Sequence, residues 1–189
     1  MKNAIILSGN EKVASAIGDI LKEVSIEDTK TYSHASAVRG EIDYGEGNLY
    51  IINTPLVDES GVDISIEIAR KQAAEVILIV KEELIPSIEK LVVQHGVFLV
   101  SKPIQKPMLF NALKMALSAH SRMKRMQVEH ERLLAEIEDM KVINRAKCLL
   151  ISCLRMTEDE AHRYIERQAM DMRITKRGVA EGVLRTYDN

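Results

Sequence analysis

The residues best placed to do chemistry stand at the ends of apolar segments in the first half of the chain. In LYIINTPLVDESGVDIS, residues 49–65, Asn53 ends an apolar segment just before Pro55. Ser8 and Lys102 stand at the ends of two similar segments. A carboxylate at such a place could accept a phosphoryl group or bind Mg²⁺, which prefers hard oxygen ligands. Asn53 carries an amide instead, and an amide cannot form an acyl phosphate.

Apolar strands and amphipathic helices alternate over residues 1–118 and predict the framework that holds these side chains. Nearly continuous Ile, Leu and Val segments indicate strands buried on both faces, as in parallel sheets. The expected strands are 3–8, 26–32, 48–53, 75–80 and 97–101, and the expected helices include 11–24, 63–74 and 85–96. This alternation predicts an α/β fold with a doubly wound, five-stranded parallel sheet. Functional residues in such sheets lie at the carboxyl ends of strands, where Asn53, Val80 and Lys102 are expected.

A helical pattern without internal Gly or Pro follows Pro107 and continues for nearly fifty residues. Such length is unusual in a globular domain and favours a coiled coil. Spacings that alternate between four and three residues define a seam of Ala119, Met123, Met126, His130, Leu133, Ile137 and Met140. Because this stripe would otherwise face water, we expect residues 119–141 to form a homodimeric coiled coil. The alternative is a linker helix packed against its own domain.

The last part of the chain, residues 142–189, predicts an all-α module of three helices. Thr157 and Glu160 have the spacing of a capping box, and Thr175 is a second candidate cap. The charge also changes along the chain. Residues 1–120 carry 12 Lys and Arg against 16 Asp and Glu, whereas residues 121–189 carry 14 against 12. A basic C-terminal half in a nearly neutral protein directs attention to that half for anionic partners.

The composition argues against several classes of protein. With no Trp and 4% aromatic residues, stacking platforms for single strands are not expected. Cys148 and Cys153 fit no CxxC pattern and are expected to be buried thiols in a reducing cytosol. The histidines have no ligand spacing, so neither a metal nor a cofactor is expected. No uncharged apolar run of 18 residues and no nucleophile–base pair occur, so we expect a cytoplasmic protein that neither spans a membrane nor acts as an enzyme.

Residues 1–118 resemble the receiver domain of two-component response regulators, through the alternation of strands and helices, Asn53, and Lys102-Pro103 after the fifth strand. Receivers hold Mg²⁺ with acids after the first strand and accept the phosphoryl group on an Asp after the third. Here Ser8 and Gly9 replace the acid pair, and Asn53 stands at the degenerate phosphoacceptor position. The resemblance therefore implies a flavodoxin-like fold without phosphorylation, regulated by a partner protein or a small ligand. Lys102, the receiver lysine, is expected to make a structural hydrogen bond or salt bridge.

Residues 142–184 resemble the ANTAR module, the RNA-binding domain of transcription antitermination regulators. The matching elements are Ala146-Lys147, Leu149-Leu150, the segment TEDEAHRYIERQAM and the segment VAEGVL. Cys148 stands where the family usually has Gly, and Cys is also small. A receiver-like domain, a long dimerising helix and a three-helix tail are the ANTAR arrangement. The resemblance implies a dimer that binds hairpins in leader transcripts and so prevents a terminator from forming.

Basic and aromatic side chains of the module are the expected RNA contacts. Arg163 and Arg167 are four residues apart and share a helix face, and Tyr164 beside them could stack on an unpaired base. The full expected set is Arg145, Lys147, Arg163, Tyr164, Arg167, Arg173, Lys176 and Arg177. A DNA-binding regulator and a protein-interaction dimer without nucleic-acid binding are the alternatives. The lack of a three-residue turn containing Gly before the last helix argues against a helix-turn-helix.

Overall fold

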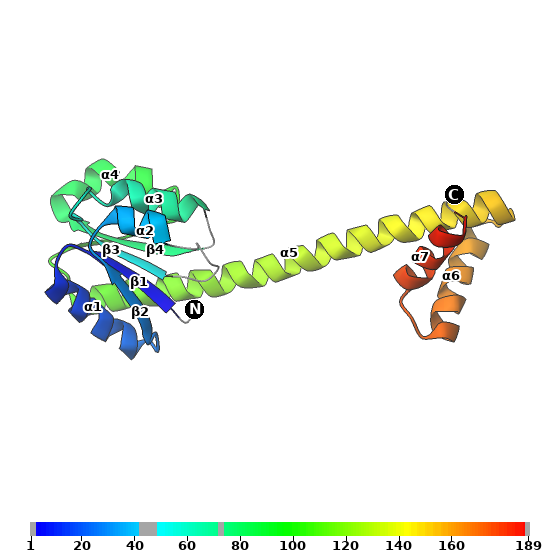
Figure 1. Ribbon diagram of the computed structural model, residues 1–189, viewed down its shortest axis with the longest axis horizontal. Coiled ribbons are helices and arrows are strands. Elements are labelled where there is room, and N and C mark those ends of the chain that lie inside the picture. Colours follow the sequence, from blue (N-terminus) through cyan, green and yellow to red (C-terminus); the bar gives the residue numbers. More distant parts are fainter. Residues whose placement is uncertain (1–2, 42–48, 72–73, 188–189) are drawn as a thin grey trace. The chain divides into compact units, whose positions relative to one another are not determined.

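The computed structural model describes residues 3–41, 49–71 and 74–187, and the chain divides into two compact units, Met1–Arg125 and Met126–Asn189. The first unit contains a five-stranded parallel sheet in the order β2-β1-β3-β4-β5 (Figure 1). Its strands are β1 (Asn3–Ser8), β2 (Asp28–Tyr32), β3 (Leu49–Asn53), β4 (Glu75–Lys81) and β5 (Phe98–Lys102). The predicted sheet is confirmed. The expected strand residue 48 and helix residues 72 and 73 lie outside the described residues.

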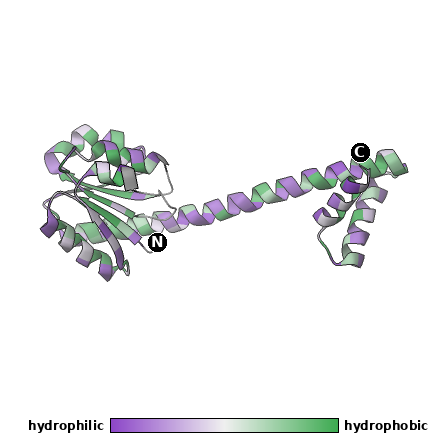
Figure 2. Ribbon diagram, viewed as in Figure 1, coloured by the Kyte–Doolittle hydropathy of each residue, from purple (hydrophilic) through white to green (hydrophobic). Residues whose placement is uncertain are grey.

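Helices cover both faces of this sheet, as Figure 1 shows. They are α1 (Glu11–Glu23), α2 (Ala35–Glu41), α3 (Val62–Lys71), α4 (Ile85–Val93) after a 3-10 turn at Glu82–Leu84, and the first part of α5 (Lys106–Leu154). Successive residues of a strand point to opposite faces. Ile6 of β1 accordingly belongs to the core that includes residues of α1 and α5, whereas Leu7 belongs to the core that includes residues of α2, α3 and α4. Figure 2 shows the resulting layers, with hydrophobic strands between helices that carry hydrophilic residues.

The second unit is built from the end of α5, α6 (Glu158–Met172) and α7 (Lys176–Tyr187). Ala146 of α5, Ala161 of α6 and Ala180 of α7 are fully buried, and such small side chains let helix backbones approach closely. The predicted capping box at the start of α6 is present: Thr157 Oγ1 accepts from the Glu160 N–H at 3.3 Å, and the Glu160 carboxylate accepts from the Thr157 N–H at 2.8 Å. The three-helix module expected from the sequence is therefore present.

The predicted coiled-coil segment, residues 119–141, lies in the middle of α5, and the first helix of the module is the end of the same helix. The division into three parts at residues 118 and 141 stays a prediction. The expectation of two buried thiols is wrong, because Cys148 and Cys153 are both exposed. Ala146 and Leu150 occupy the face of α5 that packs into the module, so these two cysteines point to other sides. Over the described residues, no helix is long and apolar enough to cross a bilayer.

Candidate nucleic-acid interface and receiver centre

Asn53 lies at the carboxyl end of β3, where its side chain is buried and hydrogen-bonded to another side chain of the protein. It is 5% exposed, and its Nδ2 donates to Ser8 Oγ at 2.9 Å. Ser8 Oγ in turn donates to the carbonyl oxygen of Asn10 at 3.0 Å. Asn53 Oδ1 accepts no hydrogen bond from the described residues. The two side chains expected at this edge therefore meet, but as an amide and a hydroxyl rather than as carboxylates.

Lys102 and Thr54 complete this centre. Lys102 Nζ donates to the Thr54 carbonyl oxygen, and Thr54 Oγ1 donates to the Ile79 carbonyl oxygen at 2.9 Å. Burial lowers the pKa of Lys102, and the nearby Lys81 lowers it further. Val80, at the end of β4, is buried and has no hydroxyl group to offer. Lys102 thus makes the structural hydrogen bond expected from the sequence.

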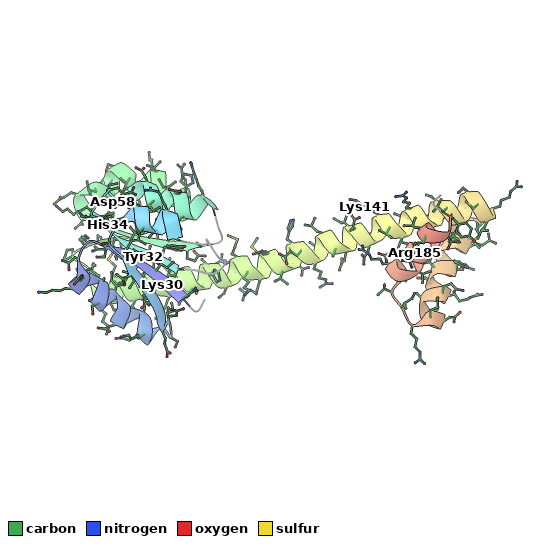
Figure 3. All side chains as sticks on the ribbon, viewed as in Figure 1. Lys30, Tyr32, His34, Asp58, Lys141 and Arg185 are labelled. Carbon is green, nitrogen blue, oxygen red and sulfur yellow. The ribbon has the colours of Figure 1, made fainter. Side chains whose placement is uncertain are left out.

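Asp58 is the first carboxylate after Asn53, and both of its oxygens are engaged. Oδ1 accepts from the Ala35 N–H at 2.9 Å and Oδ2 from the Ser36 N–H at 3.0 Å, so Asp58 caps the start of α2. These backbone hydrogen bonds, that of Ser36 first, hold the pKa of Asp58 well below its usual range. Figure 3 labels Asp58 near His34 at this end of the unit. Among the described residues there is no group of three or more His, Cys, Asp or Glu that could hold a metal ion.

The expected RNA-binding residues fall into two groups in the structure. The first group lies on α6 and in the turn after it. Arg163, Tyr164 and Arg167 are exposed on α6, and Arg173 is exposed in the turn. Arg167 and Arg173 make no ion pair or hydrogen bond with any side chain in the described part of the chain. The pKa of Glu160 is lowered most by the backbone hydrogen bond of Thr157 and least by Arg163.

The second group consists of cations with acidic partners inside the module. Lys147 Nζ lies 3.2 Å from Glu158, and its side chain is only 15% exposed. Lys176 Nζ lies 2.6 Å from Glu166 and lowers the pKa of that carboxyl. Because an ion pair offsets the charge that would attract a phosphate, these cations are weaker candidates for RNA contact than those on α6.

Arg177 is the most strongly held cation of this second group. It binds Glu181 at 2.8 Å and Asp139 at 2.7 Å, which joins α7 to α5. These hydrogen bonds raise the pKa of Arg177, that with Glu181 most. Arg145 is exposed on α5 and engaged in an interaction of its own. Sequence reasoning missed the structural roles of Asp139 and Glu158, because their partners Arg177 and Lys147 lie on other helices.

The connection between α6 and α7 corrects one argument made from the sequence. It contains three residues, Arg173–Thr175, which is the turn length of a helix-turn-helix. Arg173 adopts the left-handed conformation (φ 56°) that usually favours glycine, and Thr175 Oγ1 caps α7 by accepting from the Gly178 N–H. A tight turn therefore forms without glycine. The missing glycine does not argue against DNA binding.

The predicted seam of α5 is exposed throughout the second unit. Met126 is 62% exposed, Ile137 46% and Met140 56%. The module packs on another side of the helix, because Ala146 is six residues, or about 240° around the axis, from Met140. The seam is therefore free to pair with a second helix without disturbing the module core.

Comparisons with known proteins cover both parts of the chain. The ANTAR domain family matches residues 131–184. The transcriptional regulatory protein PdtaR of two Mycobacterium tuberculosis strains is 30% identical over 139 residues, which cover 74% of this chain and 68% of PdtaR. The response regulator StyR shares the fold over 98% of both chains, with a TM-score of 0.69 and 11% identity. A receiver domain protein of Clostridium thermocellum covers 67% of this chain and 99% of its own, with a TM-score of 0.55 and 17% identity.

The structural likenesses show the fold, and the sequence matches show the family. A receiver-like domain followed by a long helix and an ANTAR domain defines a class of transcription regulators. The chain belongs to the ANTAR family, with a receiver-like N-terminal domain.

Proposed function

We propose that this regulator acts in transcription antitermination, by binding hairpins in leader transcripts as a dimer. The observation that carries the proposal is the exposed surface of α6 in a chain of the ANTAR family. Arg163 and Arg167 lie one turn apart on that surface, with Tyr164 between them. Arginine can contact phosphates and stack on bases, and an exposed Tyr ring offers a surface to an unpaired loop base.

In this proposal, the side chains on the α6 surface make the strongest contacts with the RNA. Arg173 extends it into the turn, where a left-handed backbone presents the side chain at the end of α6. Lys147, Lys176 and Arg177 contribute less, because each has an acidic partner in the module. Arg145 lies near the start of the module on α5 and would add a peripheral contact.

The exposed seam of α5 supports the proposed dimer. An unpaired apolar stripe of this length in water is unfavourable, and pairing it with a second copy removes it from water. Two modules in one dimer could engage two hairpins of the same transcript. The second binding event would then be intramolecular, which raises the overall affinity above that of one module.

The receiver-like unit has no part in phosphoryl transfer in this proposal. Asn53 cannot form an acyl phosphate, and Asp58 is committed to the start of α2. A partner protein or a small ligand would therefore provide the regulating input.

The test is a binding experiment with the full-length protein and a leader RNA that carries two tandem hairpins. We expect the RNA to bind as a complex with a protein dimer, and a duplex DNA of the same length to compete at least tenfold less well. An RNA with one hairpin deleted is the matched ligand control, and its affinity should be lower because the second contact is lost. Preference for duplex DNA would favour the DNA-binding alternative. If neither nucleic acid binds, the protein-interaction dimer becomes the better explanation.

A further inference from the structure

The helices α5 and α6 are each followed by an arginine in the left-handed backbone conformation. Arg155 follows α5 and Arg173 follows α6, and each has a φ of 56°. This conformation is unfavourable for a residue with a Cβ atom, and glycine is the usual residue there. After α4 the chain does have a glycine, Gly96, with a φ of 81°. The two arginines therefore make the module less stable than glycine would at the same positions.

The turn after α6 uses hydrogen bonds that do not require an arginine side chain. The Arg173 N–H donates to the Met170 carbonyl oxygen at 3.3 Å. The Ile174 N–H donates to the Ala169 carbonyl oxygen at 3.1 Å. These are the two backbone bonds of a Schellman motif, which glycine at the left-handed position forms equally well. The guanidinium group of Arg173 is thus not needed to end α6.

The side chains of the two arginines make no polar contact that would offset the unfavourable backbone. Both are exposed, and in the described part of the chain neither side chain forms an ion pair or a hydrogen bond. Lys147 and Lys176 of the same module, in contrast, have acidic partners. Unfavourable backbone conformations without a structural benefit are typical of functional sites. We therefore looked for a ligand of the module that both arginines could contact.

The two arginines lie at opposite ends of α6. Arg155 comes two residues before Thr157, which caps the start of α6, and Arg173 stands at the end of the helix. With 15 residues, α6 is about 22 Å long. The exposed Arg163 and Arg167 lie between the two ends. Exposed cations are thus distributed along the whole of α6 and beyond both of its ends.

The first turn of α6 also carries acids, which would repel a phosphate group. Two of them are engaged within the module, because Glu158 pairs with Lys147 and the Glu160 carboxylate accepts from the Thr157 N–H. Asp159 is the third acid of this turn. Its charge reduces the attraction that Arg155 can exert, so we expect a moderate contribution from Arg155.

We infer that Arg155 and Arg173 contact phosphate groups of the bound RNA, one at each end of α6, so that the RNA spans the length of this helix. The inference rests on the proposed function and adds Arg155 to the expected RNA-binding residues. The planar fork of N–H donors in arginine matches a phosphate, and each phosphate contact releases counterions. Replacing either arginine with glycine should therefore stabilise the module and weaken RNA binding at the same time.

The variants Arg155→Gly and Arg173→Gly of the full-length protein test the inference, with the leader RNA that carries two tandem hairpins. We expect each variant to bind this RNA about three- to fivefold more weakly and to lower the slope of log K against log[salt] by about 1. Amide hydrogen exchange in α6 should become slower, because glycine adopts the left-handed conformation without the steric cost. Fluorescence anisotropy measures the binding, and mass spectrometry of peptides from α6 measures the exchange.

Three control variants separate the charge from the backbone. Ser25, after α1, is left-handed as well (φ 63°), so Ser25→Gly should slow exchange in α1 and leave RNA affinity unchanged. Arg155→Gln keeps the Cβ atom and loses the charge, so it should weaken binding without slowing exchange. Arg185→Gln removes an exposed cation from α7 and measures the general effect of one lost charge.

The outcomes distinguish the inference from the proposed function. If Arg155→Gly and Arg173→Gly lose no more affinity than Arg185→Gln, the inference is wrong, whereas the proposed function stands as long as the native protein binds the RNA. Faster exchange in α6 of both glycine variants would mean that the arginines stabilise the module, and this too would overturn the inference. If the native protein does not bind the RNA, both the proposed function and the inference are wrong.

Discussion

The carboxyl edge of the sheet and the outward surface of α6 both gather polar side chains, but their surroundings are opposite. At the edge, Asn53 is buried and bound to Ser8, and Lys102 is bound to Thr54. On α6, Arg163 and Arg167 extend into solvent. Polar groups that bind each other inside a protein contribute to its stability, whereas exposed cations remain available to phosphates. The receiver-like unit thus has a receiver fold with a hydroxyl at Ser8 and an amide at Asn53, whereas Arg163 and Arg167 are exposed cations on α6.

The largest expected effect concerns the α6 surface. We expect the double variant Arg163→Gln/Arg167→Gln to lower RNA affinity about 100-fold at physiological salt and to reduce the slope of log K against log[salt] by about 2. The free energy of unfolding should change by less than about 0.5 kcal/mol, because the changes lie on the surface. Fluorescence anisotropy over a salt series and urea unfolding measure the two effects.

The matched control for this variant is Lys141→Gln/Arg185→Gln, which removes the same charge from the second unit. Figure 3 labels Lys141 on α5 and Arg185 on α7, away from α6 in sequence. Removal of two positive charges weakens RNA binding in any variant. We expect the RNA affinity of this control to fall by less than about threefold in addition to that general loss. An equal loss in both double variants would mean that net charge, and not the α6 surface, governs binding.

The next effect tests whether the sheet edge is committed to structure. We expect Asn53→Asp to destabilise the receiver-like unit by about 1–3 kcal/mol at neutral pH, because it removes the donor to Ser8 and buries a carboxylate. Urea unfolding measures this change. Neither the native protein nor the variant should be labelled by acetyl phosphate with Mg²⁺, because one carboxylate holds the ion poorly. Labelling of the native protein would overturn our interpretation of this edge.

A smaller effect is expected for the cap of α2. Asp58→Ala should lower the free energy of unfolding, because two backbone N–H groups lose their acceptor. The pKa of Asp58 is lowered in the folded protein, so its contribution is present above the unfolded pKa of about 3.9 and is lost as the pH falls toward the folded value. The difference between the native protein and the variant, measured by thermal unfolding, should therefore shrink in acid. The stability of Asp58→Asn, which keeps one acceptor oxygen, should lie between that of the native protein and that of Asp58→Ala.

The smallest effect should come from Lys147. Glu158, its partner, is 77% exposed, and ion pairs near the surface contribute little, so Lys147→Gln should change stability by less than about 1 kcal/mol. RNA affinity should fall by less than about threefold. Fluorescence anisotropy measures this change by comparing the variant with the native protein. A tenfold loss would place Lys147 with the α6 residues and would remove the distinction between paired and exposed cations.

Local periodicity was sufficient to predict the sheet and the module, and the reason is physical. Strands such as residues 75–80 are buried on both faces, so their apolar character is visible without knowledge of their neighbours. The capping box of α6 is likewise a contact between residues three positions apart. Periodicity failed for Cys148 and Cys153, because apolar neighbours in sequence do not reveal which side of a long helix faces the core.

The sequence by itself therefore determined the order of the elements, the absence of carboxylates at Ser8 and Asn53, and the stripe of apolar residues on α5. Each of these depends on residue type or on spacing along one element. Only the tertiary structure decided which cations are paired, because Arg177 meets Asp139 across 38 positions of sequence. It also decided that Asp58 caps α2 and that Met115 faces outward, since both depend on which elements the fold brings together.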